Sequence, residues 1–288
     1  MRNEKYLQKV LNKEVVDYLY HIGLTSESEE IKKMKNIKAV VMAGSRKRIQ
    51  RMAAEYQGNK ESFVLEKKER FYGEYKGDVL FISHGMGIPS MSICLQEVLK
   101  LIYYVKHGDM EAVNKIFICR VGTSGGLQLP EGSIVLTKES FMADLKPYKI
   151  KRLGNDNLTY SGSYPQNVID AIIESNKNEN IKINIGNTIS GDDFYLEQLR
   201  QDGATIILDE GERDKVFKAF VDKGIKNIEM EAAAIPAFCG DFGHYNYATV
   251  CATLVDRYHD DQVNSTAEQL KEYSLRAERV IFNYLKTL

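Results

Sequence analysis

Residues 79–106 read VLFISHGMGIPSMSICLQEVLKLIYYVK and predict a strand, a tight turn and a helix in succession. The first part, Val79–Ser83, is almost continuously apolar, as in a strand that is buried on both faces. Gly85 and Gly87 suit a tight turn, and Pro89 suits the first turn of the helix that follows. Apolar side chains then recur with the helical period, at Ile93, Leu95, Val98, Leu99 and Ile102. The stretch is therefore typical of a β–α unit.

Short β-rich runs alternate with helical patterns along the rest of the chain. Further strands are predicted at Ile37–Met42, Lys115–Val121, Ser133–Thr137, Ile183–Thr188, Asn227–Glu231 and Tyr247–Leu254. Helices are predicted at Pro89–Lys106, Gln166–Ser175 and Gly211–Lys223. Such alternation indicates an α/β fold, with helices layered on a sheet. No linker or repeat divides the chain, so we expect one domain over residues 1–288, with an added amphipathic helix in residues 1–20 and a surface loop at Lys149–Gly162.

The composition excludes several classes of protein. Lys and Arg total 39 and Asp and Glu total 40, so the net charge is −1 and no basic field would attract a nucleic acid. The most apolar stretch, Val79–Val105, contains His84, Glu97 and Lys100, and so falls short of the roughly 20 apolar residues that span a bilayer. The N-terminal residues are charged throughout and lack the apolar core of a secretory signal. We expect a cytoplasmic protein without a membrane or nucleic-acid partner.

The cysteines and histidines predict no metal site. Cys94, Cys119, Cys239 and Cys251 are far apart in the sequence and lie in mainly apolar segments, so we expect reduced core residues. The five histidines are scattered, and none has the spacing of a metal-ligand set. Neither a metal nor another cofactor is therefore predicted.

Three strand ends carry residues that could bind a ligand, since ligands of open α/β sheets lie beyond the carboxyl ends of the strands. The first strand runs into Gly44 and the basic residues 46–48, which suit either an anion site or an ordinary β–α turn. The second runs into Gly85 and Gly87, but Ser90 replaces the third glycine of the dinucleotide fingerprint, so a dinucleotide site is not favoured. The third places Arg120 inside an apolar strand, where a guanidinium needs an anion, either a ligand or an acidic side chain.

Four motifs share their order and spacing with a known family. They are SHGMGIPS (83–90), RVGTSGG (120–126), GNTISGDDFYLEQLRQDGA (186–204) and NIEMEAAA (227–234). In these motifs the chain resembles the uridine phosphorylase family of the type I nucleoside phosphorylase superfamily, from about residue 20 to the end. The Gln-x-Arg pair after Asp-Phe-Tyr belongs to the pyrimidine branch. The resemblance implies an α/β/α sandwich around a central mixed, twisted and partly barrel-like sheet.

The implied reaction is cleavage of a nucleoside by inorganic phosphate. Its site must hold an anion beside the sugar, bind the sugar hydroxyls and stabilise the departing base. The resemblance assigns the phosphate to Gly44, Arg48, Arg120 and Thr123, with Arg70 reaching in from a neighbouring subunit. It also sends His21 of a neighbouring subunit to the ribose 5′-hydroxyl. It thus implies a homo-oligomer, a dimer or a hexamer of dimers, that shares its active sites and uses phosphate as a co-substrate rather than a cofactor.

The resemblance assigns the ribose to Met230 and Glu231. Strand alternation would send Glu229 and Glu231 to the same side, whereas a helix that begins at Glu231 would explain its charge without a ligand. The residues that it assigns to the base are Gly125, Phe194, Gln198, Arg200, Leu254 and Val255. Phe194 can stack on a flat ring, Gln198 can donate to and accept from a uracil edge, and Arg200 can neutralise charge on a carbonyl oxygen.

Three positions depart from the family pattern. Asp256 stands where uridine-cleaving members usually have asparagine and where hexameric purine-cleaving members place an acidic proton donor, although it could pair with Arg257 or Arg200 instead. Leu199 stands where glycine is expected, so the local backbone should differ. Phe71 stands where some members use an acidic residue for a monovalent cation, so no cation site is predicted.

These residues predict reversible phosphorolysis of uridine, and of deoxyuridine, to uracil and the pentose 1-phosphate. One alternative is a purine or broad-specificity nucleoside phosphorylase that uses Asp256 as its general acid. The other is a catalytically silent paralogue that binds nucleosides. Hydrolysis is disfavoured, because arginines placed for phosphate have no use when water is the nucleophile.

Overall fold

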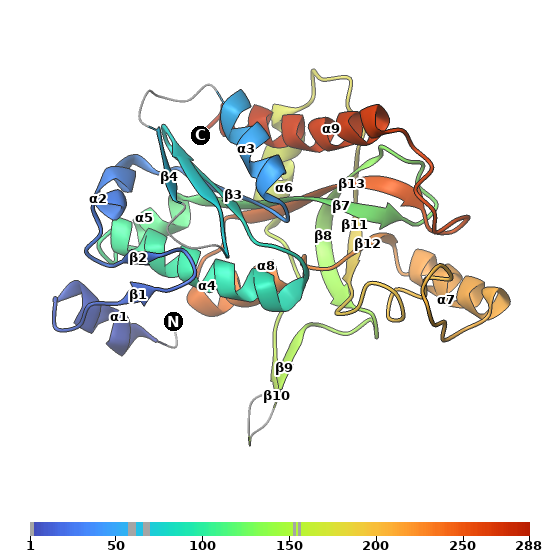
Figure 1. Cartoon of the computed structure of the whole chain (residues 1–288), viewed down its shortest axis with the longest axis horizontal. Helices are drawn as coiled ribbons and strands as arrows, with labels where there is room; N and C mark the ends of the chain where they lie inside the picture. The colour runs from blue at the N-terminus through green and yellow to red at the C-terminus, as the bar shows by residue number, and fades with distance from the viewer. Residues whose placement is uncertain (1–2, 57–61, 66–69, 152–153, 155–156) are drawn as a thin grey trace. The chain divides into compact units, whose positions relative to one another are not determined.

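The computed structural model describes residues 3–56, 62–65, 70–151, 154 and 157–288. The chain forms two compact units. The first comprises Met1–Arg120 and Phe238–Tyr247, and the second comprises Val121–Ala237 and Ala248–Leu288. Figure 1 labels most of their helices and strands.

The first unit is built on a sheet in the order β7-β3-β6-β5-β4. The parallel strands are β7 (Phe117–Gly126, of which residues up to Arg120 belong here), β3 (Ala39–Ala43) and β6 (Val79–Ser83), and the antiparallel ones are β5 (Gly73–Lys76) and β4 (Ser62–Leu65). Every residue of β3 and β6 is buried, which explains their unbroken apolar sequences. Because Ala43 pairs with Ser83, the two strands end side by side.

Helices and a small hairpin surround this sheet. They are α1 (Glu4–Leu11), β1 (Tyr18–Leu19), β2 (Leu24–Thr25), α2 (Glu29–Lys33), the 3-10 helix η1 (Met34–Asn36), α3 (Arg46–Glu55), α4 (Gly87–Val105) and α5 (Met110–Lys115). At the start of α3, the Ser45 hydroxyl accepts the Arg48 amide at 3.3 Å and so caps the helix. α3 then packs against β3, β5 and β6.

The second unit contains a closed ring of strands in the order β12-β11-β8-β13-β7. Their bounds are Ile225–Glu229 for β12, Ile183–Ser190 for β11, Ile134–Met142 for β8 and Tyr247–Asp256 for β13, with β7 contributing from Val121 onward. β12, β11 and β8 are parallel, β13 is antiparallel to β8, and antiparallel pairing of β7 with β12 closes the ring. The expected α/β fold with a mixed, partly barrel-like sheet is confirmed.

A chain of buried side-chain hydrogen bonds crosses four strands of this ring. The hydroxyls of Thr137 on β8 and Thr188 on β11 lie 2.8 Å apart. Thr188 donates to Asn227 on β12 at 2.8 Å, and Asn227 donates to Ser124 on β7 at 3.0 Å. Each group thus finds a partner inside the core, where an unpaired one would be costly. The chain of bonds includes β12 and β7, the two strands that close the ring.

Further helices and a second hairpin belong to this unit. They are β9 (Lys149–Lys151), β10 (Asn157–Thr159), α6 (Gln166–Ser175), α7 (Glu210–Asp222), α8 (Ala234–Phe242, of which residues up to Ala237 belong here) and α9 (Ala267–Leu285). Capping boxes start α7 at Asp209 and α9 at Thr266. In Figure 1 the hairpin of β9 and β10 extends away from the end of β8.

The strands and helices predicted from the sequence are present, with ends that differ by a few residues. Two expectations are wrong. Residues 1–20 do not form one helix, because α1 ends at Leu11 and Lys13 takes a left-handed φ of +61°. Lys149–Gly162 is not simply a loop, because β9 pairs with β10 inside it and Tyr148 stacks on Tyr160 with 6.2 Å between ring centroids. The single domain over residues 1–288 stays a prediction.

Candidate active site

Two glycine turns lie at the edge of the first unit's sheet, where β3 and β6 end. A Cβ on Gly44 would lie 3.1 Å from the Gly85 carbonyl oxygen, and a Cβ on Gly85 would lie 2.6 Å from Ser90 Oγ. Gly85 also has a φ of +75°. Both turns therefore depend on glycine. Ser90 donates to the His84 carbonyl oxygen at 2.6 Å, so this departure from the dinucleotide fingerprint has a structural use.

The basic residues after β3 differ in their surroundings. Arg46 lies over the ring of Tyr72, with Cζ 4.6 Å from the centroid, and Lys47 is exposed. Arg48 is half-buried in the first turn of α3. The positive end of this helix and the bare backbone of Gly44 together suit an anion, so the turn and the anion site are compatible interpretations.

β7 carries the third predicted strand end. Arg120 is 4% exposed and pairs with Met42 of β3 in the first unit, so the expected burial of its guanidinium is confirmed. Thr123 and Gly125 follow in the second unit, where both are half-buried and share one side of the strand. A Cβ on Gly125 would lie only 2.4 Å from Arg257 Cγ, so glycine here makes room for that arginine.

α4 holds His21 in place within the first unit. The buried carboxylate of Glu97 accepts the amides of His21 and Ile22 at 3.0 and 2.8 Å, and its Oε1 lies 2.7 Å from His21 Nδ1. This contact favours the tautomer with a proton on Nδ1. The His21 ring also lies 6.0 Å from the ring of Phe71, which directly follows the exposed Arg70. The two residues that we expect to serve a neighbouring subunit therefore lie at the same part of this unit.

Glu229 shapes the turn that carries Met230 and Glu231. β12 ends at Glu229, whose carboxylate accepts the Ser190 hydroxyl at 2.6 Å and the Glu231 amide at 2.9 Å. Strand alternation therefore does not continue to Glu231. Since α8 begins only at Ala234, a helix start at Glu231 does not explain its charge either. Glu231 is 4% exposed and Met230 is half-buried.

The turn after β11 is stabilised by its own acidic side chains. Asp193 accepts the amides of residues 195–197, and Glu197 accepts those of residues 192 and 193. This turn exposes Phe194, whose ring centroid lies 4.6 Å from Arg200 Cζ. The cation–π contact occupies one face of the ring, so the stacking of Phe194 on a base stays a prediction.

Gln198 and Arg200 are both buried, at 5% and 9% exposure. Gln198 Nε2 has no hydrogen-bond partner among the described residues. A buried donor without a partner is costly, and a ligand with a hydrogen-bond acceptor would relieve that cost. Leu199 between them has a φ of +55°, in a conformation that glycine adopts freely.

Arg200 forms a two-pronged ion pair with Asp202. Nε lies 2.7 Å from Oδ1 and Nη2 lies 2.5 Å from Oδ2. Burial alone would lower the pKa of Arg200, but the hydrogen bond with Asp202 and the negative charges of Asp202 and Asp261 together outweigh burial and raise it. The same hydrogen bond lowers the pKa of Asp202. The pair is therefore charged at neutral pH, and Arg200 Nη1 takes no part in it.

Asp256 forms hydrogen bonds to two backbone amides. It follows the half-buried Leu254 and the buried Val255. Its Oδ1 accepts the amides of Gln128 and Tyr258 at 3.0 and 3.1 Å. The arginines that we considered as partners pair with other carboxylates, Arg257 with Asp261 and Arg200 with Asp202. Burial lowers the pKa of Arg257, which is 1% exposed. These contacts give Asp256 a structural role.

The four cysteines are free and buried, as the sequence predicts. Burial raises the pKa of the Cys94 and Cys239 thiols, as expected of inert core residues. In the part of the chain that the structure describes, no three His, Cys, Asp or Glu side chains gather as metal ligands would. Of the described helices, none has the length and apolar character needed to cross a membrane.

Comparison with known proteins decides the family. A sequence model of the Phosphorylase superfamily matches residues 38–286. The chain belongs to the phosphorylase superfamily. The resemblance in its motifs is thereby confirmed.

Relatives within the phosphorylase superfamily cover nearly the whole chain. Uridine phosphorylase 1 of Mus musculus is 32% identical over 281 residues, which cover 94% of this chain and 88% of the relative. Inactive uridine phosphorylase B of Schistosoma mansoni is 30% identical and covers 94% of this chain and 92% of its own length. The crystal structure of Schistosoma mansoni uridine phosphorylase in complex with thymine gives a TM-score of 0.86 at 30% identity, over 96% of this chain and 97% of that one.

Several polar residues that support the candidate residues of this phosphorylase were not predicted to do so from the sequence. They are Glu97, Asp202, Arg213, Glu229 and Asp261. Glu97 has a signal, because a carboxylate in an apolar helical stretch must find partners. Asp202 has a weaker one, two residues after Arg200. Asp261 has none, since its amide-donating partner Gln201 lies 60 residues away.

Proposed function

We propose that this phosphorylase catalyses the reversible phosphorolysis of uridine, and of deoxyuridine, to uracil and the pentose 1-phosphate. The observation that carries the proposal is the buried Gln198 amide nitrogen, which has no partner among the described residues and lies two residues before the cationic Arg200 in the chain. An amide and a guanidinium match the alternating carbonyl and N–H groups of a uracil edge. The similarity to uridine phosphorylases over 94% of the chain supports this choice of substrate.

In this proposal phosphate is the nucleophile. The Gly44 amide, Arg48, Arg120 and Thr123 bind it, and Arg70 of a neighbouring subunit adds a further cation. A phosphate oxygen bonds to C1′ of the sugar as the bond from C1′ to the base breaks, and the bonding electron pair leaves with uracil. Holding both reactants in line supplies much of the rate enhancement.

Glu231 accepts the 2′- and 3′-hydroxyls of the ribose, and Met230 packs beside it. Glu229 supports this arrangement by fixing the turn through the Glu231 amide at 2.9 Å. His21 of a neighbouring subunit accepts a hydrogen bond from the 5′-hydroxyl through Nε2. The joint placement of His21 and Arg70 at one part of the first unit supports a homo-oligomer with shared sites.

The departing uracil carries its negative charge on its carbonyl oxygens. Gln198 and Arg200 stabilise this charge directly, so the reaction needs no proton donor at the base. Gly125, Phe194, Leu254 and Val255 complete the surroundings of the ring. Asp256 keeps its loop together rather than acting as an acid, which argues against the purine alternative.

The proposal includes the organisation of the whole protein. The family match over residues 38–286 covers both compact units, which supports a single functional domain. Inorganic phosphate is a co-substrate, and we propose that no cofactor or metal takes part. A cytoplasmic location stays a prediction from the sequence.

One assay tests the substrate and the nucleophile together. Purified protein receives uridine and inosine at equal concentration, with and without inorganic phosphate, and products are separated by chromatography. We expect uracil and ribose 1-phosphate, formed only with phosphate and ahead of hypoxanthine. Hypoxanthine ahead of uracil would contradict the pyrimidine assignment, uracil without phosphate would indicate hydrolysis, and no free base would indicate a silent binding protein.

A further inference from the structure

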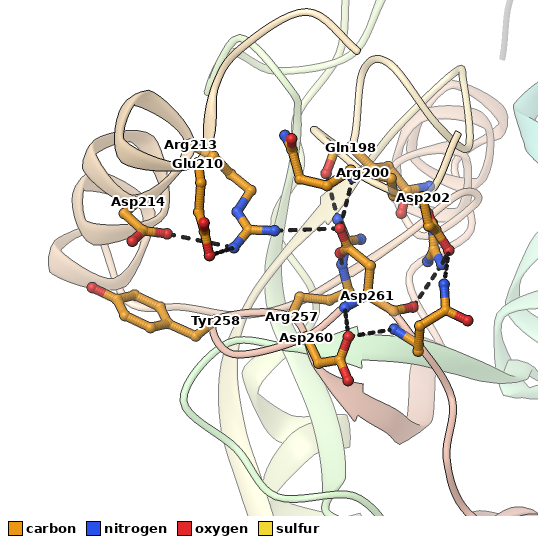
Figure 2. A network of polar contacts seen from close by, with 12 residues as sticks. Gln198, Arg200, Asp202, Glu210, Arg213, Asp214, Arg257, Tyr258, Asp260 and Asp261 are labelled. Atoms are coloured by element: carbon orange, nitrogen blue, oxygen red, sulfur yellow. Dashed lines mark hydrogen bonds and ion pairs between the residues drawn. The ribbon is translucent and has the colours of Figure 1, made fainter. Parts of the chain in front are cut away.

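A buried carboxylate outside the residues assigned to catalysis lies in the loop after β13. Asp261 is 5% exposed, and the side chains around it are cationic. Its Oδ1 accepts Arg257 Nε at 2.5 Å, and its Oδ2 accepts Arg213 Nη1 at 3.3 Å (Figure 2). Oδ2 also accepts the backbone amide of Gln201 at 2.7 Å. Both carboxylate oxygens are therefore in use.

These contacts converge on the segment that contains Gln198 and Arg200. Arg257 links Asp261 to Gln198, because its Nη2 donates to the Gln198 carbonyl oxygen at 2.7 Å. The backbone carbonyl of Asp261 itself accepts Arg200 Nη2 at 2.7 Å. Asp261 thus holds both ends of residues 198–201, one through Arg257 and the other through the Gln201 amide.

The segment needs such support. Leu199 lies in the left-handed region at φ +55°, which a leucine adopts only where its surroundings impose it. That conformation directs the side chains before and after it. Gln198 Nε2, which has no hydrogen-bond partner in the described part of the chain, can be oriented accurately only if the backbone of residues 198–201 is fixed.

The charges give Asp261 a second task. Arg257 and Arg213 are 1% and 4% exposed, and a buried guanidinium without an anion beside it is strongly destabilising. The other carboxylates near Arg213, those of Asp214 and Glu210, are exposed and lie farther away, at 3.6 and 3.9 Å. Asp261 is thus the buried carboxylate that both arginines share, and its removal would release Arg257 from the Gln198 backbone.

We propose that Asp261 is a positioning residue for base recognition, which acts through Arg257 and the Gln201 amide to aim Gln198 and Arg200 at the pyrimidine ring. The inference rests on the proposed function, since it needs Gln198 and Arg200 to bind the base. It predicts that replacing Asp261 weakens the binding of uridine and uracil but does not change the affinity for phosphate.

The test compares Asp261→Asn with Asp170→Asn, the same change at an exposed aspartate of α6. We expect Asp261→Asn to lower kcat/KM for uridine roughly 10- to 100-fold, chiefly by raising KM for uridine. KM for phosphate should stay within about twofold of the wild-type value. Asp170→Asn should match the wild type in every constant. If the substitution only damaged the fold, KM for uridine and KM for phosphate would both rise.

Arg257→Lys tests the same connection without removing the carboxylate. A lysine keeps a cation beside Asp261 but cannot also reach the Gln198 carbonyl oxygen with a second donor. It should reproduce the rise in KM for uridine, and the double variant should be no worse than either single one, because both changes break one connection. Additive losses, or an unchanged KM for uridine in Asp261→Asn, would overturn the proposal.

Calorimetry with uracil separates this inference from the proposed function. If the wild type binds uracil without cleaving uridine, the proposed activity fails, and a weaker uracil affinity in Asp261→Asn still supports the positioning role. If the wild type cleaves uridine, and Asp261→Asn binds uridine and uracil as tightly as the wild type does, the positioning role is refuted but the proposed function is not. A wild type that binds no uracil refutes both.

Discussion

Leu199 occupies a left-handed backbone position between the two residues that we propose to read the base. Its φ is +55°, and its side chain packs against the buried cluster that contains Ile189 and Phe217. For a residue with a Cβ this conformation costs about 1–2 kcal/mol, whereas glycine adopts it freely. Strain and side-chain packing therefore oppose each other at this position.

Two substitutions separate these contributions. Leu199→Ala and Leu199→Gly both remove the packing, but only glycine relieves the strain. We expect Leu199→Gly to be more stable than Leu199→Ala by about 1 kcal/mol in urea denaturation. At Leu196, in the same turn and without a positive φ, alanine should be the more stable, as in ordinary positions. If the alanine variant were the more stable one at Leu199 as well, Leu199 would be unstrained.

Single residues also show how far the sequence alone could go. Gln198 and Arg200 are found because a motif with fixed spacing contains both. Asp261 acts on the same segment, yet nothing near it in the sequence points to residues 198–201, since only the folded chain brings them together. Asp256 is ambiguous from its identity, and its hydrogen bonds to two backbone amides favour the structural interpretation over the catalytic one.

At the scale of elements, side chains of α4 bind the N-terminal segment of residues 17–22 through hydrogen bonds. The polar residues Glu97, Lys100 and Tyr104 of α4 recur at helical spacing and so share a face. Lys100 and Tyr104 donate to Asp17 at 2.6 and 2.7 Å, and Glu97 accepts the His21 amide at 3.0 Å. Glu97 and Lys100, which interrupt the most apolar stretch of the sequence, thus bind His21 and Asp17 of the N-terminal segment.

Removing the charge of Glu97 should loosen this attachment. A glutamine has one acceptor oxygen for the amides of His21 and Ile22 and for His21 Nδ1, and it lacks the charge that strengthens these bonds. We expect Glu97→Gln to speed hydrogen exchange of the peptide with residues 17–25 by roughly tenfold or more, measured by mass spectrometry. Glu111→Gln, which changes an exposed carboxylate on α5, should leave that exchange as it is. Unchanged exchange in Glu97→Gln would mean that other contacts hold the segment.

The elements also divide into predictable and unpredictable ones. β3 and β6 follow directly from continuous apolar runs, and α4 from its period. The closure of the ring depends on the pairing of Gly125 and Gly126 with Ile228 and Asn227, a contact between distant segments that no local pattern encodes. The predicted N-terminal helix is longer than the observed one. Amphipathic spacing does not reveal where tertiary contacts, here those of Asp17, replace helical hydrogen bonds.

At the scale of the whole molecule, stability depends on pH through a buried histidine. His244 is 0% exposed, and its Nδ1 has no hydrogen-bond partner among the described residues. Burial lowers its pKa to about 4, whereas a histidine in an unfolded chain has a pKa of about 6.5. Between these values the unfolded chain binds a proton that the folded protein does not, so the free energy of unfolding falls as the pH falls through this window.

The size of this effect can be measured by comparing pH 7 with pH 5. At pH 5 the proton on unfolded His244 destabilises the folded protein by about 2 kcal/mol, and at pH 7 by almost nothing. The chain has no Trp, so unfolding is best followed by far-UV circular dichroism. We expect His244→Asn to lose less stability than the wild type between the two pH values. His107→Asn, at an exposed histidine with a φ of +50° that asparagine tolerates, should lose as much as the wild type. Equal losses in all three proteins would show that His244 is protonated in the folded state or that acid unfolding is controlled elsewhere.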